Sequence, residues 1–336
     1  MSAPSDISPD ASAVAAAPAP AALRPTRPLY WSVRRELWEN RSIYIAPLVV
    51  AAVVLLGIIL GLVAGPHTVT TVRTTSTVVE NGAAVTQGAH LVVAATPAER
   101  AAMAAIPYDF AAMALAVTLF IVAVFYCLGA LHNERRDRSI LFWKSLPVSD
   151  VRTVAAKAIL PLAVLPPVVF VITLATQVIM LLLNAGSLVA HGKTLGAVWT
   201  QPPVGSMALV VLYGLTALTL WWAPVYGWLL LISGWARRAP FLWAVLPPLL
   251  LAMVEKIAFN TNTVGSLIQY RLLGGFQQAF VVPTKAAMKA GTAFPQGLPQ
   301  LDPGKFLSTP GLWIGLAVAA AFLAAAVWLR RYREPI

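Results

Sequence analysis

The chain has 336 residues, of which 59% are hydrophobic and only 11% charged, with a formal net charge of +11. An average soluble domain carries about 25% charged residues, so a soluble protein of this composition would expose an apolar surface and aggregate. The composition therefore excludes an ordinary soluble enzyme, a disordered chain and a fibrous protein. The single cysteine, Cys127, excludes an internal disulfide and a multi-cysteine metal site.

The first segments of the chain indicate a tail followed by a surface helix. Residues 1–27 are rich in Ala, Pro and Ser without an apolar period, which predicts a disordered cytoplasmic tail. Residues 28–40 place apolar and charged side chains near helical spacing, which predicts an amphipathic helix at the inner membrane interface. A basic flank of the first span is the alternative. The residues assigned to the interfacial helix are Trp31, Arg34, Arg35, Glu36, Trp38 and Glu39.

Long intervals between charged residues predict six membrane-spanning helices, because a helix needs about 20 largely apolar residues to cross the hydrocarbon core. The expected spans are 43–64, 110–131, 158–183, 207–235, 239–258 and 312–329, with outer segments at 65–107, 184–206 and 259–309. Sixteen of the 24 basic residues then lie on the side of the N-terminus. Since positive charge marks the cytoplasmic side, we expect an all-α polytopic membrane protein with both termini inside.

The outer segments and their boundaries carry further predictions. The Thr- and Val-rich first segment contains an Asn81-Gly82 turn signal, which predicts a small hairpin. The third begins with "VGSLIQYRLLGGFQQAF", which is too apolar for a solvated loop and too short to span twice. We therefore expect a re-entrant or interfacial helical pair between spans five and six, broken at Gly274 and Gly275. Asp109 is expected to cap the second span.

The inner loop at 132–157 is the most informative segment. Charged residues flank a short apolar helix at 139–146, which Pro147 ends, and Ser149 or Asp150 can cap the helix that follows. An apolar helix held in the cytoplasm by charges on both sides indicates a docking helix for a soluble partner. The alternative is that Phe142 and Trp143 lie on the inner membrane surface.

The stretch "NERRDRSILFWKSLPVSD" resembles the coupling-helix region of ABC-2-type permeases, the membrane subunits of ATP-binding cassette exporters. The stretch "YWSVRRELWENRSIYIAPL" resembles the interfacial connecting helix that leads into their first span. The resemblance covers nearly the whole chain after residue 28, although the Ala/Pro-rich tail and the Thr/Val-rich outer segment depart from the family and leave the substrate open. The ATPase-docking residues that it implies are Glu134, Arg135, Arg136, Arg138, Ile140, Phe142, Trp143, Leu146 and Pro147.

The same resemblance implies the assembly and its location. A separate ATPase subunit would bind ATP and magnesium, and a second permease copy, identical or different, would complete a transporter in the bacterial cytoplasmic membrane. The chain itself offers only "SLVAHGKT" at 187–194 as a P-loop candidate, and Ser187 stands where a glycine must let backbone N–H groups reach phosphate. We therefore expect no catalytic, cofactor or metal site in this chain. Nucleic acid is not an expected partner, because the basic residues flank spans instead of forming a groove.

Residues inside the spans suggest where a substrate could pass. Trp221 and Trp222 are central in the fourth span, and Glu255 is an ionisable residue near membrane depth, where such groups are costly and often functional. These three form the possible translocation path; the alternative places Glu255 at the outer interface. Two other functions stay open: a gradient-driven secondary transporter, which needs buried proton-carrying acids, and a polytopic membrane enzyme acting on lipid-linked substrates.

Overall fold

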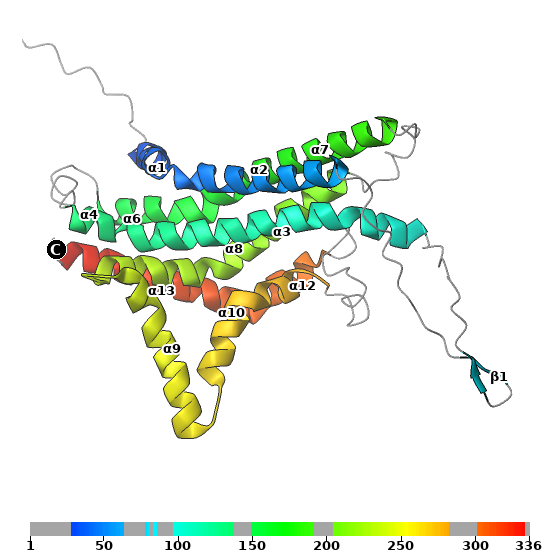
Figure 1. Ribbon diagram of the computed structural model, residues 1–336. Helices are drawn as coiled ribbons and strands as arrows, with labels where there is room; N and C mark the ends of the chain where they lie inside the picture. Colours follow the sequence, from blue (N-terminus) through cyan, green and yellow to red (C-terminus); the bar gives the residue numbers. More distant parts are fainter. Residues whose placement is uncertain are drawn as a thin grey trace, which may run out of the picture.

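The computed structural model describes residues 28–63, 78–80, 83–85, 97–137, 149–190, 204–281 and 301–332. The elements, in chain order, are α1 (Pro28–Glu39), α2 (Ser42–Val63), β1 (Val78–Glu80), β2 (Ala83–Val85), α3 (Pro97–Ala130), α4 (His132–Arg136), α6 (Asp150–Ile159), the π-helix η1 (Leu160–Val164), α7 (Leu165–Ala190), α8 (Val204–Trp235), α9 (Pro240–Phe259), α10 (Thr263–Ala279), α12 (Pro303–Ser308) and α13 (Pro310–Tyr332). Long helices lie side by side in a bundle, from which α9 and α10 project (Figure 1).

Six helical stretches of the described chain are long and apolar enough to cross a membrane. They are Ser42–Val63, Ala105–Arg136, Asp150–Ala190, Gly205–Trp235, Pro240–Phe259 and Pro310–Tyr332. The prediction of a helical protein with six candidate membrane spans is therefore confirmed. Which side of the membrane each end occupies stays a prediction.

The bundle is built around α3 and α8. Leu115 and Leu119 of α3 and Tyr226 and Leu230 of α8 are almost fully buried. Helix α13 packs along α8, α10 packs on α8, and α2 packs against α3 and α7. Only 11% of the apolar window of α2 is buried, so most of its Val, Leu and Ile side chains face outward, as expected of a helix whose surroundings are lipid.

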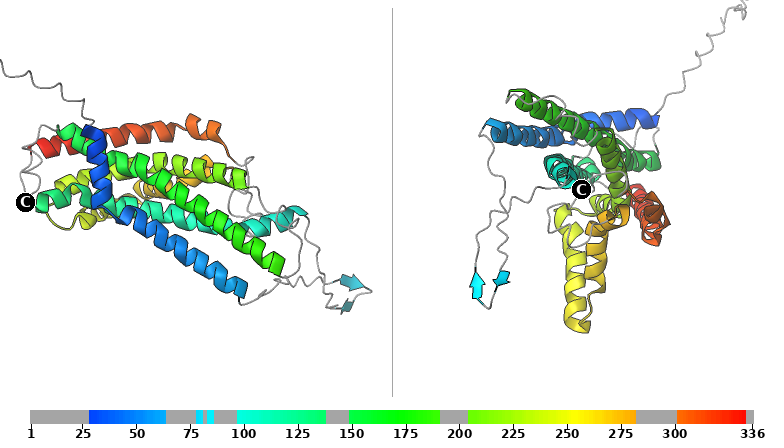
Figure 2. Two further views of the ribbon diagram at one scale, coloured as in Figure 1. Left: turned by 90° about the horizontal axis from the view of Figure 1, so that it is seen from above. Right: turned by 90° about the vertical axis from the view of Figure 1, so that its right-hand side faces the viewer.

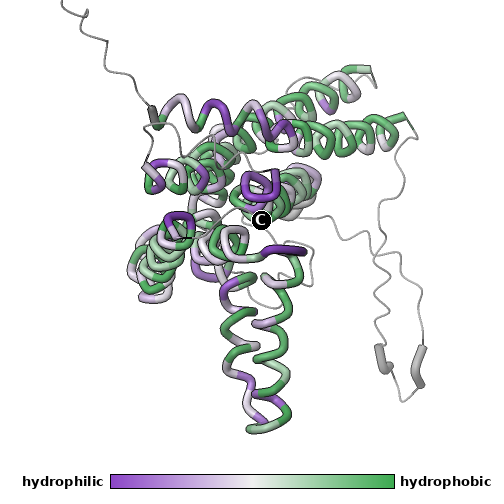
Figure 3. The backbone as a smooth tube through the Cα atoms, turned by 90° about the vertical axis from the view of Figure 1, so that its left-hand side faces the viewer, coloured by the Kyte–Doolittle hydropathy of each residue, from purple (hydrophilic) through white to green (hydrophobic). Residues whose placement is uncertain are grey.

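The two ends of the bundle differ in chemistry. Helices α1, α4 and α6 and the end of α13 lie together at one end (Figure 1). The view from this end shows hydrophilic residues in α1 and at the near ends of the bundle helices, with apolar residues along their lengths (Figure 3). Helix α1 runs across the bundle instead of along it (Figure 2). The helix predicted at 28–40 is therefore confirmed, and its orientation suits an interfacial element.

Helices α3 and α7 extend well beyond the predicted spans. Helix α3 begins at Pro97 and passes through Pro107, so Asp109 lies well inside a helix and the predicted cap was wrong. The Ala-rich stretch before it is a strong helix former and continues the helix into the expected outer segment. Helix α7 likewise continues to Ala190. The helix is π-helical over η1, which contains Pro161. A proline removes a helical hydrogen bond and so favours a local change of this kind.

The single helix α10 replaces the expected broken helical pair. Helix α10 is continuous through Gly274 and Gly275, so the predicted break there was wrong. The glycines serve close packing instead, because a Cβ on Gly275 would lie 2.7 Å from Trp221 Cδ1. Helix α9 ends at Phe259, and the next residue, Asn260, has a left-handed φ of 50°. Only 6% of the apolar window of α9 is buried. The re-entrant placement expected of the segment at 264–280 stays a prediction.

Other predictions concern shorter segments. Strand β1 pairs antiparallel with β2, with Val78 opposite Val85, in agreement with the hairpin predicted around Asn81-Gly82. The tail at 1–27, the centre of the inner loop at 138–148 and the segment at 282–300 lie outside the described residues.

Candidate functional site: an ionic network on both sides of the inner loop

Two short helices form the ends of the inner loop. Helix α4 begins the loop and α6 lies at its end, on either side of residues 138–148. Ser149 begins α6: its Oγ accepts a hydrogen bond from the Arg152 backbone N at 3.4 Å, which confirms Ser149 as the predicted cap. Whatever position the loop takes, its two ends are set by α4 and α6.

Lys157 of α6 stands between two carboxylates. Its Nζ lies 2.8 Å from Glu36 Oε1 of α1 and 3.1 Å from Glu134 Oε1 of α4. The side chains of Lys157 and Glu36 are each 3% exposed, and that of Glu134 is 10% exposed. Charges removed from water to this extent are stable only when they are paired and hydrogen-bonded. One ammonium group thus joins α1, α4 and α6.

Arg330 of α13 extends the network on the other side of Glu134. Its Nη1 donates to Glu134 Oε2 at 2.6 Å, and its Nε donates to Asp150 Oδ1 at 3.1 Å. Both oxygens of Glu134 are therefore engaged by cations from different helices. The last turns of α13 are held to the residues on both sides of the inner loop.

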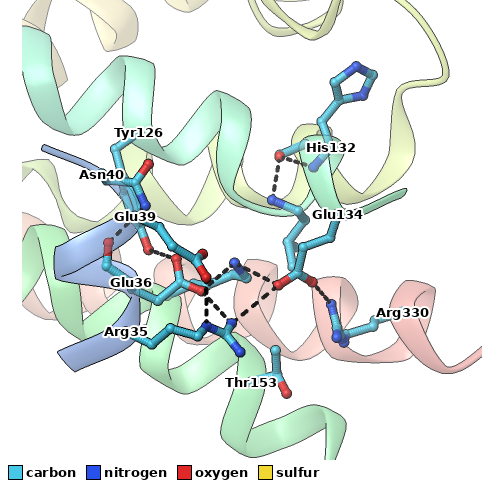
Figure 4. Close-up of polar contacts among 12 residues, drawn as sticks. Arg35, Glu36, Glu39, Asn40, Tyr126, His132, Glu134, Thr153 and Arg330 are labelled. Atoms are coloured by element: carbon cyan, nitrogen blue, oxygen red, sulfur yellow. Dashed lines mark hydrogen bonds and ion pairs between the residues drawn. The ribbon is translucent and has the colours of Figure 1, made fainter. Parts of the chain in front are cut away.

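Charged residues of helix α1 complete this set of contacts, which meet at Glu36 (Figure 4). Arg35 Nη2 lies 3.1 Å from Glu36 Oε1 and 3.8 Å from Glu134 Oε1, and Arg35 Nε lies 3.2 Å from Glu39 Oε1. The Tyr126 hydroxyl of α3 donates to Glu36 Oε2 at 3.1 Å. We call Arg35, Glu36, Glu134, Asp150, Lys157 and Arg330 the ionic network.

A second set of contacts ties α4 to the end of α8. The Ser233 hydroxyl accepts hydrogen bonds from the backbone N–H groups of Leu131 and His132, at 3.0 and 2.9 Å. Arg135 Nη1 donates to the Gly234 carbonyl oxygen at 2.7 Å. The His132 ring is buried, and its Nδ1 lies 3.2 Å from the Ala236 carbonyl oxygen. A movement of the inner loop would thus reach α1, α8 and α13 through bonded contacts.

The structure places the predicted docking residues in three groups. Glu134 and Arg135 are buried and contact the bundle itself. Arg136 is exposed and pairs with Asp137 at 3.1 Å. Arg138, Ile140, Phe142, Trp143, Leu146 and Pro147 lie outside the described residues. The docking role of this set stays a prediction.

The predicted interfacial residues separate onto two faces of α1. Trp31 and Trp38 are 55% and 69% exposed, and the Arg34 guanidinium lies over both rings, with its Cζ 5.3 Å and 5.6 Å from their centroids. Indole rings next to a cation suit the headgroup layer of a membrane. Glu36 lies on the opposite face, in the ionic network, which sequence reasoning did not foresee.

The three residues of the possible translocation path do not share a site. Trp221 is fully buried, and its ring contacts Tyr270, at 5.1 Å between centroids, and Phe306. Trp222 donates from Nε1 to the Leu272 carbonyl oxygen at 3.1 Å. Both therefore attach α8 to its neighbours. Arg271 also belongs to this packing: it lies over the Trp221 ring, at 4.7 Å, and burial lowers the pKa of its guanidinium.

Glu255 holds the turn between α9 and α10. Its Oε1 accepts from Thr261 Oγ1 at 2.8 Å and from the Thr263 backbone N at 2.7 Å, and its Oε2 accepts from the Val264 backbone N at 2.7 Å. A carboxylate at the start of α10 satisfies free N–H groups and favours the positive end of the helix dipole. Its role in the structure is that of a helix cap.

Replacing Glu255 with glutamine is expected to loosen this turn. The amide removes the charge and one of the two acceptor oxygens, so the N–H groups of Thr263 and Val264 should exchange with deuterium several-fold faster in detergent-solubilised protein. Lys256→Gln is the matched control, because Lys256 is exposed and the capping hydrogen bonds are accepted by the neighbouring Glu255 instead. Equal exchange in the Glu255 variant and in the unchanged chain would contradict the capping role.

The described residues contain no group of three or more His, Cys, Asp or Glu side chains that could hold a metal ion. Comparisons with protein-family models, with characterised proteins and with solved structures find no match for the chain. The resemblance to ABC-2-type permeases therefore rests on the residues of the chain alone.

Proposed function

We propose that this chain is the permease subunit of an ABC exporter, which moves a substrate across the bacterial cytoplasmic membrane by using ATP hydrolysis on a separate subunit. The observation that supports the proposal most strongly is the ionic network. Both ends of the inner loop are bonded to α1 and α13, and α4 is bonded to α8. A permease needs contacts of this kind if an ATPase outside the membrane is to change the arrangement of its spans.

In the proposed mechanism, the apolar residues of the loop bind the ATPase, and the ionic network transmits the movement of the ATPase to the spans. Nucleotide binding closes two ATPase subunits beneath two permease copies, and the loop moves with them. Glu134 and Arg135 act inside the permease, whereas Arg136 and the residues at 138–147 contact the ATPase. Both termini and the network lie on the cytoplasmic side.

Phe142→Asp and Trp143→Asp test the docking step. A charge on the apolar surface of the loop should abolish co-purification of the ATPase with the tagged chain, because a buried unpaired carboxylate would oppose the interface. Phe142→Leu is the matched control, and it should retain the ATPase. The amount of each variant in the membrane shows that insertion is intact, and the captured partner is identified by mass spectrometry.

An ATPase captured equally by the two aspartate variants would contradict docking through this loop. Transport by the purified chain without any nucleotide-hydrolysing partner would contradict the proposed function as a whole and would favour a gradient-driven transporter.

A further inference from the structure

A cavity lies between α3, α7, α8 and α10, on the half of the bundle away from the ionic network. It holds about 720 Å³ of empty space, including its open mouth. Its walls are apolar except for two side chains, Asp109 of α3 and Gln177 of α7. Met113, Met207, Phe276 and Phe280 are among the apolar residues that line it. The site is separate from the inner loop and from the translocation residues predicted from the sequence.

Neither Asp109 nor the Gln177 side-chain oxygen has a hydrogen-bond partner among the residues that the structure describes. Gln177 is 3% exposed, and its Oε1 is buried without a hydrogen bond. No ion pair or hydrogen bond joins Asp109 to another residue of the described chain. A buried acceptor without a donor destabilises a protein, and a carboxylate in an apolar wall does so more strongly. Since the same cavity holds both groups, a ligand that donates hydrogen bonds would satisfy them together.

The chemistry of the walls defines this ligand. Both polar groups present acceptor oxygens, and the ionised form of Asp109 attracts cations and disfavours anions. Phe rings and Met sulfur atoms suit the body of a cationic, apolar molecule. The basic residue of α10, Arg271, does not line the cavity; it donates to the Trp221 and Gly311 carbonyl oxygens instead.

We infer that the cavity binds an amphipathic organic cation. Its N–H groups, which share the positive charge, pair with the Asp109 carboxylate and donate to Gln177 Oε1, and its apolar part lies against Met113, Met207, Phe276 and Phe280. Only the further step, that this cation is the transported substrate, rests on the proposed function. Binding itself requires neither an ATPase nor nucleotide.

Fluorescence anisotropy of rhodamine 6G, an amphipathic cation with N–H donors, tests the inference on the purified chain in detergent. We expect saturable binding that Asp109→Asn weakens about tenfold or more, because an ion pair is lost. Asp109→Glu should retain most of the affinity. Asp137→Asn, which neutralises an exposed carboxylate outside the cavity, should leave the affinity unchanged.

Gln177→Leu separates a binding role from a structural one. It removes a buried acceptor that the free protein leaves unsatisfied, so it should raise the thermal unfolding midpoint while weakening rhodamine 6G binding several-fold. A residue that served only stability would lower the midpoint.

Three results would overturn the inference: no saturable binding to the unchanged chain, equal affinity in folded Asp109→Asn, or tighter binding of the anionic dye anilinonaphthalene sulfonate at the same site. None of these results bears on ATPase capture, so this inference and the proposed function fail independently.

Discussion

Replacing Lys157 with methionine is expected to lower the free energy of unfolding by about 3–5 kcal/mol, the usual effect of removing one partner from a buried ion pair. The Nζ atom lies within 3.1 Å of both Glu36 and Glu134, so its loss leaves two buried carboxylates without their shared cation. Methionine keeps the volume of the side chain, which isolates the electrostatic effect. Tryptophan fluorescence during thermal unfolding in detergent measures the change.

A second substitution and a control make this test specific. Glu36→Gln in the Lys157→Met background removes one of the two carboxylates that lost the lysine and should restore part of the stability, since the two sites are directly coupled. Arg152→Met changes an exposed basic residue on the same helix and should alter stability little. Similar losses in Lys157→Met and Arg152→Met would contradict the network as the source of the effect.

Gly275→Ala is expected to separate α10 from α8. The new Cβ would lie 2.7 Å from Cδ1 and 2.9 Å from Cγ of Trp221, and the indole cannot swing aside because Tyr270, Phe306 and Arg271 surround it. Overpacking of this kind lowers stability by about 1–3 kcal/mol, although alanine is the better helix former. The thermal unfolding midpoint should therefore fall.

The matched control for this change is Gly61→Ala on α2. A Cβ at Gly61 meets no atom within 4 Å, so the control should be neutral or slightly stabilising. Trp221→Ala removes the obstacle, and its combination with Gly275→Ala should lose less stability than the two single changes together. Additive losses would show that the glycine acts through something other than the Trp221 contact.

The sequence predicted the helices well because lipid imposes a simple rule. A span must satisfy its own backbone groups and present apolar side chains over its length, so intervals between charges locate each helix. The same rule misplaced the limits of α3, because Asp109 was taken as a boundary whereas the helix runs through it from Pro97. It also predicted a break at Gly274 and Gly275, where glycine permits contact with Trp221 and the helix continues.

The ionic network could not be predicted from the sequence, because most of its pairs join residues far apart in the chain. Glu134 was assigned to the ATPase-docking surface through the resemblance to ABC-2-type permeases, and only tertiary packing brings Arg330 and Lys157 to it. One signal was present: Lys157 lies within a helix that leads directly into an apolar span, where a lone cation requires a partner. The cavity was missed for a related reason, since Asp109 and Gln177 belong to different helices.

The long sequence separations in the network set an order for biosynthesis. Glu36 pairs with a lysine 121 positions later, and Glu134 pairs with an arginine 196 positions later. While the ribosome is still producing α13, a nascent chain already holds Glu134 and Asp150 without Arg330. The ion pairs of Arg330 with Glu134 and Asp150 therefore form only after Arg330 has emerged from the ribosome.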